Sequence, residues 1–465
     1  LKTARAGLLL PLPGWRTGAR GRPAGSWRSC QEMDIVIRQI HTLSTRNDGD
    51  LKKLKDFLRH EQESLKANVH QIDQALQMLD PTQNTLGIAF LLAVQLGAAV
   101  FANQRATFAY IGNFLKLADE QQVKKASAQI SSVCKSYAQM AIDEGQQSML
   151  RSLVPLCSAV EKLRPNSETL TPVHAEFIRV CLKAKAYHLA EKILDQPIFD
   201  ICLINNSNSC TQLTPQSFLS YFYYGSLIRI GMKEYSKALQ LLLVVLTCPA
   251  SCLSAIQADA FKKFVLVSLK VHGEMQSLPV YASHIVQRYA KSPSYVLDIA
   301  EAFKNGDAAA LQRVVEEKAP QIQADHNAGI VNQVVASLRR HKVQMLTKTY
   351  LTLSLTEIGR EIDTQVEEVE ELLFDMISGG DINARIDQTT GNVFFEDDQS
   401  EMDIGMVDKM QDKLGQILEL AQRISSFEHE VVSSEAYIRK MAALEGVGGS
   451  PAAFPAIGGY DFMDM

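Results

Sequence analysis

Apolar residues recur every three or four positions along most of the chain, which is the spacing of one face of an α-helix. The clearest such stripe consists of Phe261, Phe264, Val265, Ser268 and Leu269. Lys262, Lys263 and Lys270 fall off this stripe, so we expect them to face water. Gly273 follows as a helix stop, because glycine readily adopts the left-handed conformation that ends a helix.

Residues that favour the N-cap position precede two further apolar stripes. Asn47, Asp48 or Asp50 can cap a single helix, and Asp307 can cap a short one. The first helix would carry Leu51, Leu54, Leu58 and Leu65, and the second Leu311, Val314 and Val315. Such capped, amphipathic segments predict a mostly α fold from residue 33 to about residue 360.

Some of these helices come in pairs. Residues 217–249 predict two helices, with Gly225 at a close helix approach, Gly231 at the turn and Pro249 at the end. This order is similar to that of tetratricopeptide repeats, and the upstream stretch HAEFIRVCLKAKAYHLAEKIL predicts another pair. A stack of helix pairs forms a solenoid whose groove holds partners.

The longest apolar run, residues 86–102, has two interpretations. It is 17 residues long and contains Gln95, whereas a membrane-spanning helix needs about 20 apolar residues. No basic cluster flanks it closely. We therefore expect a buried helix and no membrane partner.

The pattern changes after Tyr350 to that of a winged helix. Residues 354–357 and 364–367 each form a capping box, S-x-x-E and T-x-x-E, and each opens a short helix. Alternating residues then predict an antiparallel β-hairpin, with a turn at residues 388–391. The apolar hairpin positions are Ile382, Ala384, Ile386, Val393 and Phe395, and we expect this hairpin to pair edge to edge with another protein.

A last helix follows the hairpin. Its apolar residues alternate spacings of three and four, as in a coiled coil: Val407, Met410, Leu414, Ile417, Ala421 and Ile424. We call these six residues the seam and expect them to contact helices of other chains. The alternative is a helix that folds back on its own winged helix.

Charge argues against nucleic acid as a partner. The formal net charge is −5, and no Lys or Arg lies between Arg360 and Arg385. The third helix of the winged helix, which reads DNA in many such domains, carries Glu367, Glu368, Glu370, Glu371 and Asp375. A DNA phosphate backbone would repel it.

No residue constellation predicts catalysis, a cofactor or a metal site. The sequence contains no Walker, GxGxxG, GxSxG, HExxH or EF-hand motif and no His-x-His pair. Its eight cysteines include no CxxC, although Cys248 and Cys252 would share a helical face. We expect free thiols in a reducing compartment, and isolated histidines such as His60, His174 and His341 in surface or core positions.

Several stretches in the right order resemble the PCI-domain family. Within that family, the stretches are similar to the members that form subunit 3 of the COP9 signalosome. They are MDIVIRQIHTL from Met33, YFYYGSLIRIG, AFKKFVLVSL, NAGIVNQVVASLRRHKVQMLTKTYLTLSLTEI from Asn327, and INARIDQTTGNVFF. The resemblance implies a mostly α chain: a tetratricopeptide-like solenoid, then a PCI winged helix with a small β-hairpin and a C-terminal bundle helix.

The residue patterns and composition, together with this resemblance, predict the domain limits. They are a disordered or non-native leader (1–32), N-terminal repeats (33–214), a PCI domain (215–397; repeats 215–340, winged helix 341–397), a C-terminal helix (401–440) and a disordered tail (445–465). An organellar transit peptide is the alternative for the Arg-rich leader, but its prolines and glycines disfavour the amphipathic helix that such a peptide forms.

The function that the resemblance implies is a non-catalytic scaffold in cytoplasm and nucleus. Its partners would be other signalosome subunits, bound through winged-helix edges and a shared helical bundle, and indirectly cullin-RING ligases, from which the complex removes Nedd8. A related PCI subunit of the proteasome lid, a nucleic-acid-binding winged helix and an enzyme without a known motif remain alternatives.

Overall fold

The chain divides into two compact units, Leu1–Lys342 and Val343–Met465. The structure is a computed structural model that describes residues 25–44, 47–98, 104–201, 213–362, 364–387, 390–395 and 404–445. The division falls inside one long helix, α19 (Ala328–Thr347).

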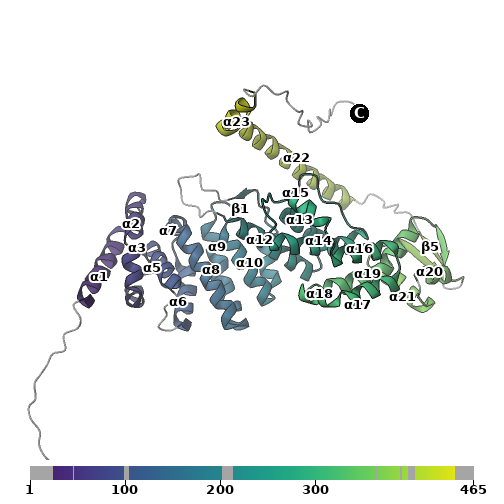
Figure 1. Ribbon diagram of the computed structural model, residues 1–465, viewed down its shortest axis with the longest axis horizontal. Coiled ribbons are helices and arrows are strands. Elements are labelled where there is room, and N and C mark those ends of the chain that lie inside the picture. Colours follow the sequence, from purple (N-terminus) through teal and green to yellow (C-terminus); the bar gives the residue numbers. More distant parts are fainter. Residues whose placement is uncertain are drawn as a thin grey trace, which may run out of the picture. The chain divides into compact units, whose positions relative to one another are not determined.

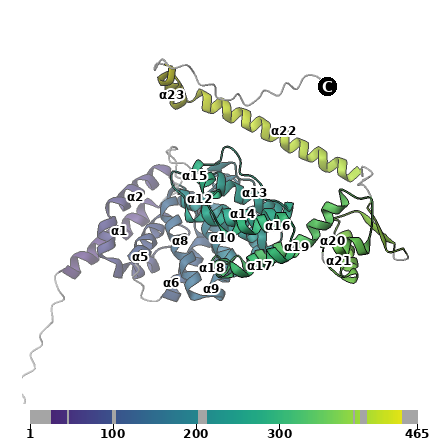
Figure 2. The ribbon, with the colours of Figure 1, turned by 45° about the vertical axis from the view of Figure 1, so that its right-hand side comes forward.

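Successive helices of the first unit lie side by side, as Figures 1 and 2 show. They are α1 (Gly25–Leu43), α2 (Asp48–His60), α3 (Gln62–Ala67), η1 (Val69–Gln71), α4 (Ile72–Met78), α5 (Thr85–Ala98), α6 (Gln104–Leu117), α7 (Glu120–Lys125), α8 (Ser127–Glu144), α9 (Gln146–Leu163), α10 (Pro172–Ala184), α11 (Tyr187–Leu194), α12 (Pro215–Gly231), α13 (Tyr235–Thr247), α14 (Ala255–His272), α15 (His284–Ala290), α16 (Tyr295–Asn305), α17 (Ala308–Glu317) and α18 (Ala319–Ala324). Two short parallel strands, β1 (Thr169–Leu170) and β2 (Asp200–Ile201), lie among them. The predicted helical-repeat architecture is confirmed.

The core of this unit is drawn out along the helix array. One cluster of buried side chains extends from Met33 to Ile228, and a second extends from Leu219 to Leu338. Helix α12 contributes to both, because Tyr221 belongs to the first cluster and Leu219 to the second. Each helix thus buries its stripe on its neighbours.

The apolar run forms a buried helix, as predicted. Helix α5 covers residues 85–98, and residues 99–102 lie outside the described part of the chain. Gln95 is buried within it and donates from Nε2 to Asp73 Oδ1 at 2.6 Å, which satisfies part of its amide. Among the described helices, none combines the length and apolarity needed to cross a bilayer.

The predicted first helix is two helices. Leu51, Leu54 and Leu58 are buried on α2, which Asn47 precedes, whereas Leu65 lies on α3. The break falls at Glu61, whose backbone N–H bonds the Phe57 carbonyl. The apolar spacing continues across the break, so periodicity alone did not reveal it.

The prediction that Lys262 and Lys263 face water is wrong. Lys263 is 6% exposed, and its ammonium lies 3.0 Å from Asp259 Oδ2 and 5.6 Å from the centre of the Tyr223 ring. Lys262 is half-buried and lies 2.6 Å from Asp325. Lys263 thus pairs with a carboxylate of its own helix beneath a ring of α12, whereas Lys262 reaches the C-cap residue of α18. The stripe itself and the Gly273 stop are confirmed, with Gly273 at φ +73°.

The α12–α13 pair is confirmed, with a different turn residue. A Cβ on Gly225 would lie 2.8 Å from Leu194 Cδ2, so glycine permits the close approach of α12 to α11. Gly231 is instead the last residue of α12, and the left-handed residue of the turn is Lys233 at φ +65°. Helix α13 ends at Thr247, before Pro249.

The second unit contains a winged helix. Helices α20 (Leu355–Ile362) and α21 (Val366–Ser378) pack with strands β3 (Thr352–Ser354), β4 (Ala384–Asp387) and β5 (Asn392–Phe395) around a third cluster, which also includes Val343 of α19. The β4–β5 hairpin is confirmed, with Ile386 opposite Val393. Strand β3 was not predicted, because its three residues adjoin the capping box.

Only one of the two predicted capping boxes forms. Ser354 Oγ accepts from the Glu357 N–H at 3.2 Å, and the Ser354 N–H donates back to Glu357 Oε2 at 3.3 Å. The second box is wrong because Gln365 is the N-cap of α21, and the Thr364 hydroxyl donates instead to the Ile362 carbonyl.

The chain ends of the described part differ from expectation. Helix α1 begins at Gly25, before the expected start of ordered structure at Met33. The expected C-terminal helix is two helices, α22 (Ile404–Ser433) and α23 (Glu435–Glu445), separated at Ser434. Residues 1–24 and 446–465, to which the leader and tail predictions mainly apply, lie outside the described residues.

Helix α10 begins at a buried capping box that requires a neutral histidine. The Thr171 N–H donates to His174 Nδ1 at 3.1 Å, and the Thr171 hydroxyl lies 2.8 Å from the same nitrogen. His174 is 3% exposed, and burial lowers its pKa to about 4. The ring therefore lies in the core as an acceptor, without a positive charge.

We predict that His174 makes the first unit acid-sensitive. The unfolded histidine has a pKa of about 6.5, so the unfolded state binds more protons between pH 6.5 and 4. The free energy of unfolding should fall by about 3 kcal/mol across this window. His174→Gln keeps a side-chain acceptor but cannot titrate, so urea unfolding of that variant should lack this part of the pH dependence. Equal acid sensitivity in both proteins would contradict the prediction.

Candidate assembly surfaces

The sheet of the winged helix leaves its outer strands open. The strand order is β3–β5–β4, so β5 pairs on both sides, whereas each outer strand has one neighbour within the described residues. An unpaired strand edge presents backbone N–H and C=O groups that another strand can bond. Strand β4 is therefore the part of the predicted hairpin whose backbone is open.

The five hairpin residues predicted at an interface lie in the domain's own core. Ile382, Val393 and Phe395 are buried, and Ala384 and Ile386 are half-buried against the same cluster. The alternation that marked them is that of a strand covering a core, and it does not distinguish that role from contact with a partner. An interface at the hairpin would therefore use the β4 backbone and the side chains around it.

A groove of about 630 Å³ runs beside β4. It is lined by Glu367, Glu370, Glu371 and Phe374 of α21 and by Ile386 and Asp387 of β4. The Phe374 ring is 65% exposed, which is unusual for an aromatic side chain of a helix that packs on a core. Phe374 falls off the buried stripe of α21, so the apolar spacing did not mark it.

The same groove makes α21 unsuitable for contact with a duplex. Four acidic residues line it, and its walls contain no Lys or Arg. On the hairpin, the Arg385 guanidinium lies 5.6 Å from the centre of the Phe394 ring, where it covers an aromatic face. The arrangement suits a basic protein segment.

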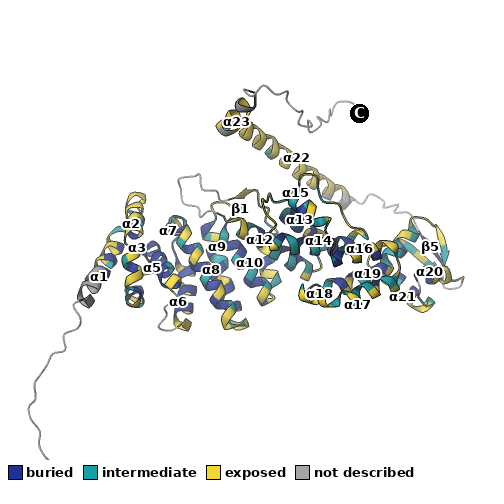
Figure 3. Cartoon of the chain, in the orientation of Figure 1, coloured by how far each residue is buried: buried dark blue, intermediate teal, exposed yellow. Residues whose placement is uncertain are grey.

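The seam on α22 is exposed. The exposed fraction rises from 44% at Val407 to 68% at Ile424, and Met410, Leu414, Ile417 and Ala421 are exposed as well. Figure 3 shows α22 as an almost continuously yellow helix. Exposed apolar residues continue through Phe427 and Val431. A contiguous apolar surface of this extent is typical of a contact site.

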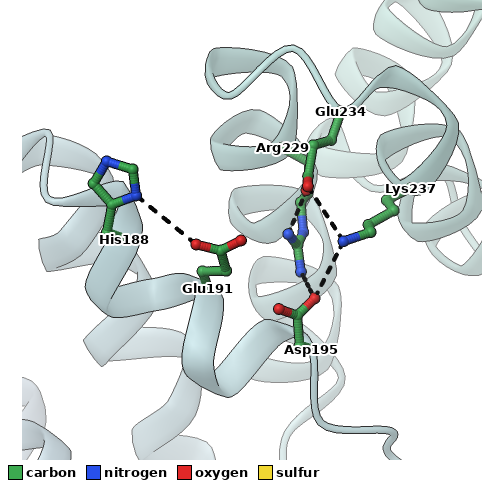
Figure 4. A network of polar contacts seen from close by, with 6 residues as sticks. All are labelled: His188, Glu191, Asp195, Arg229, Glu234 and Lys237. Atoms are coloured by element: carbon green, nitrogen blue, oxygen red, sulfur yellow. Dashed lines mark hydrogen bonds and ion pairs between the residues drawn. The ribbon is translucent and has the colours of Figure 1, made fainter.

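A charged network joins three helices of the solenoid, as Figure 4 shows. Arg229 of α12 is 2% exposed and binds Asp195, at 2.5 Å, together with Glu234. Lys237 of α13 completes the network, at 3.4 Å from Asp195 and 3.2 Å from Glu234. Burial alone would raise the pKa of Asp195, but the hydrogen bond and charge of Arg229 hold it below its usual value.

In the part of the chain that the structure describes, no three His, Cys, Asp or Glu residues are placed to bind a metal. Burial raises the pKa of Cys181 to about 12, so this thiol stays protonated and unreactive. Cys248 and Cys252 do not share a helical face, because α13 ends before Cys248.

Comparison with known proteins identifies the family of the chain. Residues 48–286 match the model of the COP9 signalosome complex subunit 3 N-terminal helical repeats, and residues 311–397 match the PCI domain. Over 415 residues the chain is 31% identical to the COP9 signalosome complex subunit 3 of Arabidopsis thaliana, covering 88% of this chain and 93% of the relative. The chain belongs to the COP9 signalosome subunit 3 family.

A second relative shows the same extent of similarity. The subunit 3 of Drosophila melanogaster is 28% identical over 425 residues, which cover 88% of this chain and 94% of the relative. In the chain described here, the PCI match begins at Leu311 on α17 and ends after β5. It therefore includes β4 and the acidic groove, whereas α22 lies beyond both family models.

We predict that Arg229 is required for the stability of the solenoid. Arg229→Ala removes a buried side chain and its charged hydrogen bonds to two partly exposed carboxylates, so it should lower the free energy of unfolding by about 1.5–3 kcal/mol. Lys237→Ala is the matched control, because half of that side chain is exposed, and it should change stability by less than about 1 kcal/mol. Urea unfolding measures the stability of both variants. Similar losses of stability in the two would contradict the prediction that Arg229 is the residue required.

Proposed function

We propose that this chain is a non-catalytic scaffold subunit of the COP9 signalosome. In this proposal it supports assembly of the complex that removes Nedd8 from cullins, and so it regulates cullin-RING ubiquitin ligases. The observation that carries the proposal is the exposed seam on α22, in a chain of the subunit 3 family.

Energetics support the seam as an attachment site. Burying one Leu, Ile or Met side chain stabilises an association by about 1.5–3 kcal/mol. Met410, Leu414, Ile417 and Ile424 each expose more than half of their surface, so partner helices would gain from covering all four. The alternating spacing matches a bundle of helices that run nearly parallel.

The β4 edge supplies the second proposed attachment. A strand from a neighbouring subunit would bond the open backbone of β4, while basic residues of that neighbour would face Glu367 and Glu371. An apolar side chain of the neighbour would cover Phe374. Backbone pairing then provides affinity, and the acids select the partner.

The proposal assigns the chemistry to another subunit. Here the chain works in cytoplasm and nucleus, takes no cofactor, and binds neither nucleic acid nor membrane. Copurification of the endogenous chain tests it directly. Recovery with signalosome subunits, cullins and Nedd8-cleaving activity is expected, whereas recovery with proteasomal ATPases would place the chain in the proteasome lid instead.

We predict that Ile417→Asp weakens assembly without unfolding the chain. The substitution puts a charge in the centre of the seam, which a bundle cannot bury without a large penalty. Gln416→Asp adds the same charge one position away, off the seam, and should assemble normally. Size-exclusion chromatography measures assembly, and circular dichroism measures the thermal midpoint of the isolated chain. If the isolated Ile417→Asp chain lost thermal stability to the same extent as it lost assembly, the result would count against the proposal.

We predict that Glu371→Lys also weakens incorporation into the complex. It reverses a charge in the groove beside β4 and should repel a basic neighbour, lowering its affinity by about tenfold. Glu301→Lys on α16 makes the same change at an exposed site of the solenoid and serves as control. Pull-down of neighbouring subunits at two salt concentrations checks the result, and equal recovery of the two variants would exclude the groove.

A further inference from the structure

A second groove lies in the N-terminal helices, remote in sequence from the surfaces above. It has a volume of about 760 Å³ and lies between α6 and α9, with Tyr137 and Glu144 of α8 also lining it. Residues from Arg105 to Lys116 on one face of α6 border it, a length of about 16 Å at 1.5 Å per residue. This length accommodates several residues of a peptide.

Tyr137 lies deep in the groove with an unused hydroxyl. The residue is only 2% exposed, and its ring stacks on Phe108 with ring centres 4.6 Å apart. Its hydroxyl makes no hydrogen bond to a residue that the structure describes. Burial raises the pKa of Tyr137 above its usual value, so the hydroxyl keeps its proton and can donate it in a hydrogen bond. Because the groove leads to this hydroxyl, a ligand in the groove can accept a hydrogen bond from it.

Gly112 and Pro155 keep this part of the groove open. A Cβ on Gly112 would lie 2.8 Å from the Tyr137 hydroxyl and 3.6 Å from Pro155 Cγ, so any larger residue would cover the hydroxyl. Pro155 lies inside α9 and has no N–H to donate to the carbonyl of Arg151. That carbonyl, four residues earlier on a groove-lining residue, lacks its usual helical donor.

The rim of the groove combines positive charge with apolar surface. Arg105, Lys116 and Arg151 line it and are exposed, and the last two form no ion pair within the described chain. Glu144 is the one acid of the lining and already accepts a hydrogen bond from the Ser148 hydroxyl at 2.8 Å. Leu150 and Val154, one helical turn apart on α9, are 49% and 61% exposed.

We propose that this groove binds an acidic peptide segment of a partner protein, with carboxylates next to apolar side chains. One carboxylate accepts a hydrogen bond from the Tyr137 hydroxyl and lies near Arg151. Apolar side chains of the peptide cover Leu150 and Val154, and a second carboxylate faces Lys116. The combination favours a peptide over a nucleic acid, whose successive phosphates would leave the apolar wall uncovered.

The test uses the full chain and a fluorescent synthetic peptide of about twelve residues, in which Asp and Glu alternate with Leu and Phe. The control peptide has Asn and Gln in place of the acids. Tyr137→Phe removes one oxygen atom and keeps the ring stack, and Arg151→Glu reverses one rim charge. Lys183→Glu, at an exposed residue of α10 outside the groove, is the matched control. Circular dichroism verifies that each variant is folded.

The acidic peptide should bind the unaltered chain and Lys183→Glu alike, and about tenfold more weakly to each groove variant, as expected for loss of a charged hydrogen bond or ion pair. Anisotropy titrations measure this. Unchanged affinity in Tyr137→Phe, or equal binding of the neutral peptide, would overturn the proposal. So would tighter binding of a single-stranded oligonucleotide. Much tighter peptide binding after removal of residues 446–465 would also overturn it, by identifying the chain's own acidic tail as the occupant.

Discussion

An amphipathic helix can bury its apolar stripe only against a neighbour, and this constraint organises the chain. In the first unit every described helix from α2 to α18 contributes buried side chains, and the two clusters meet at α12. The core therefore extends along the helix array and has no single centre. The helices of the winged helix also bury their apolar stripes in a shared cluster. The described part of α22, in contrast, leaves its apolar stripe exposed. A helix with an uncovered stripe implies a partner.

Polar residues fix the geometry that apolar packing alone leaves adjustable. Arg229 joins two carboxylates from the ends of neighbouring helices, and Lys263 is held between Asp259 and the Tyr223 ring. Hydrophobic contacts are non-directional, whereas these charged hydrogen bonds have one favourable geometry. They therefore favour one relative position of the helices that they join.

Local sequence patterns predicted most elements but fewer of the surfaces. Helical stripes, the Ser354 capping box and the β4–β5 hairpin follow from short-range spacing, and all are confirmed. The break at Glu61 and the turn at Lys233 leave the apolar spacing unchanged, and the burial of Lys263 involves a tertiary contact with the Tyr223 ring that spacing does not contain. For the same reason, alternation marked Val393 as an interface residue although it belongs to the core. The exposed Phe374 and the Tyr137 groove required three-dimensional neighbours to be recognised.

The exposed stripe of α22 also bears on how much of this protein a cell can keep. A free copy displays a row of large apolar side chains from Val407 to Val431, the kind of surface that chaperones retain and quality-control proteases recognise. A copy whose stripe is covered escapes this surveillance. If partner helices cover the stripe, as proposed, their supply would set the abundance of the chain as much as its own synthesis does, and surplus copies would be short-lived.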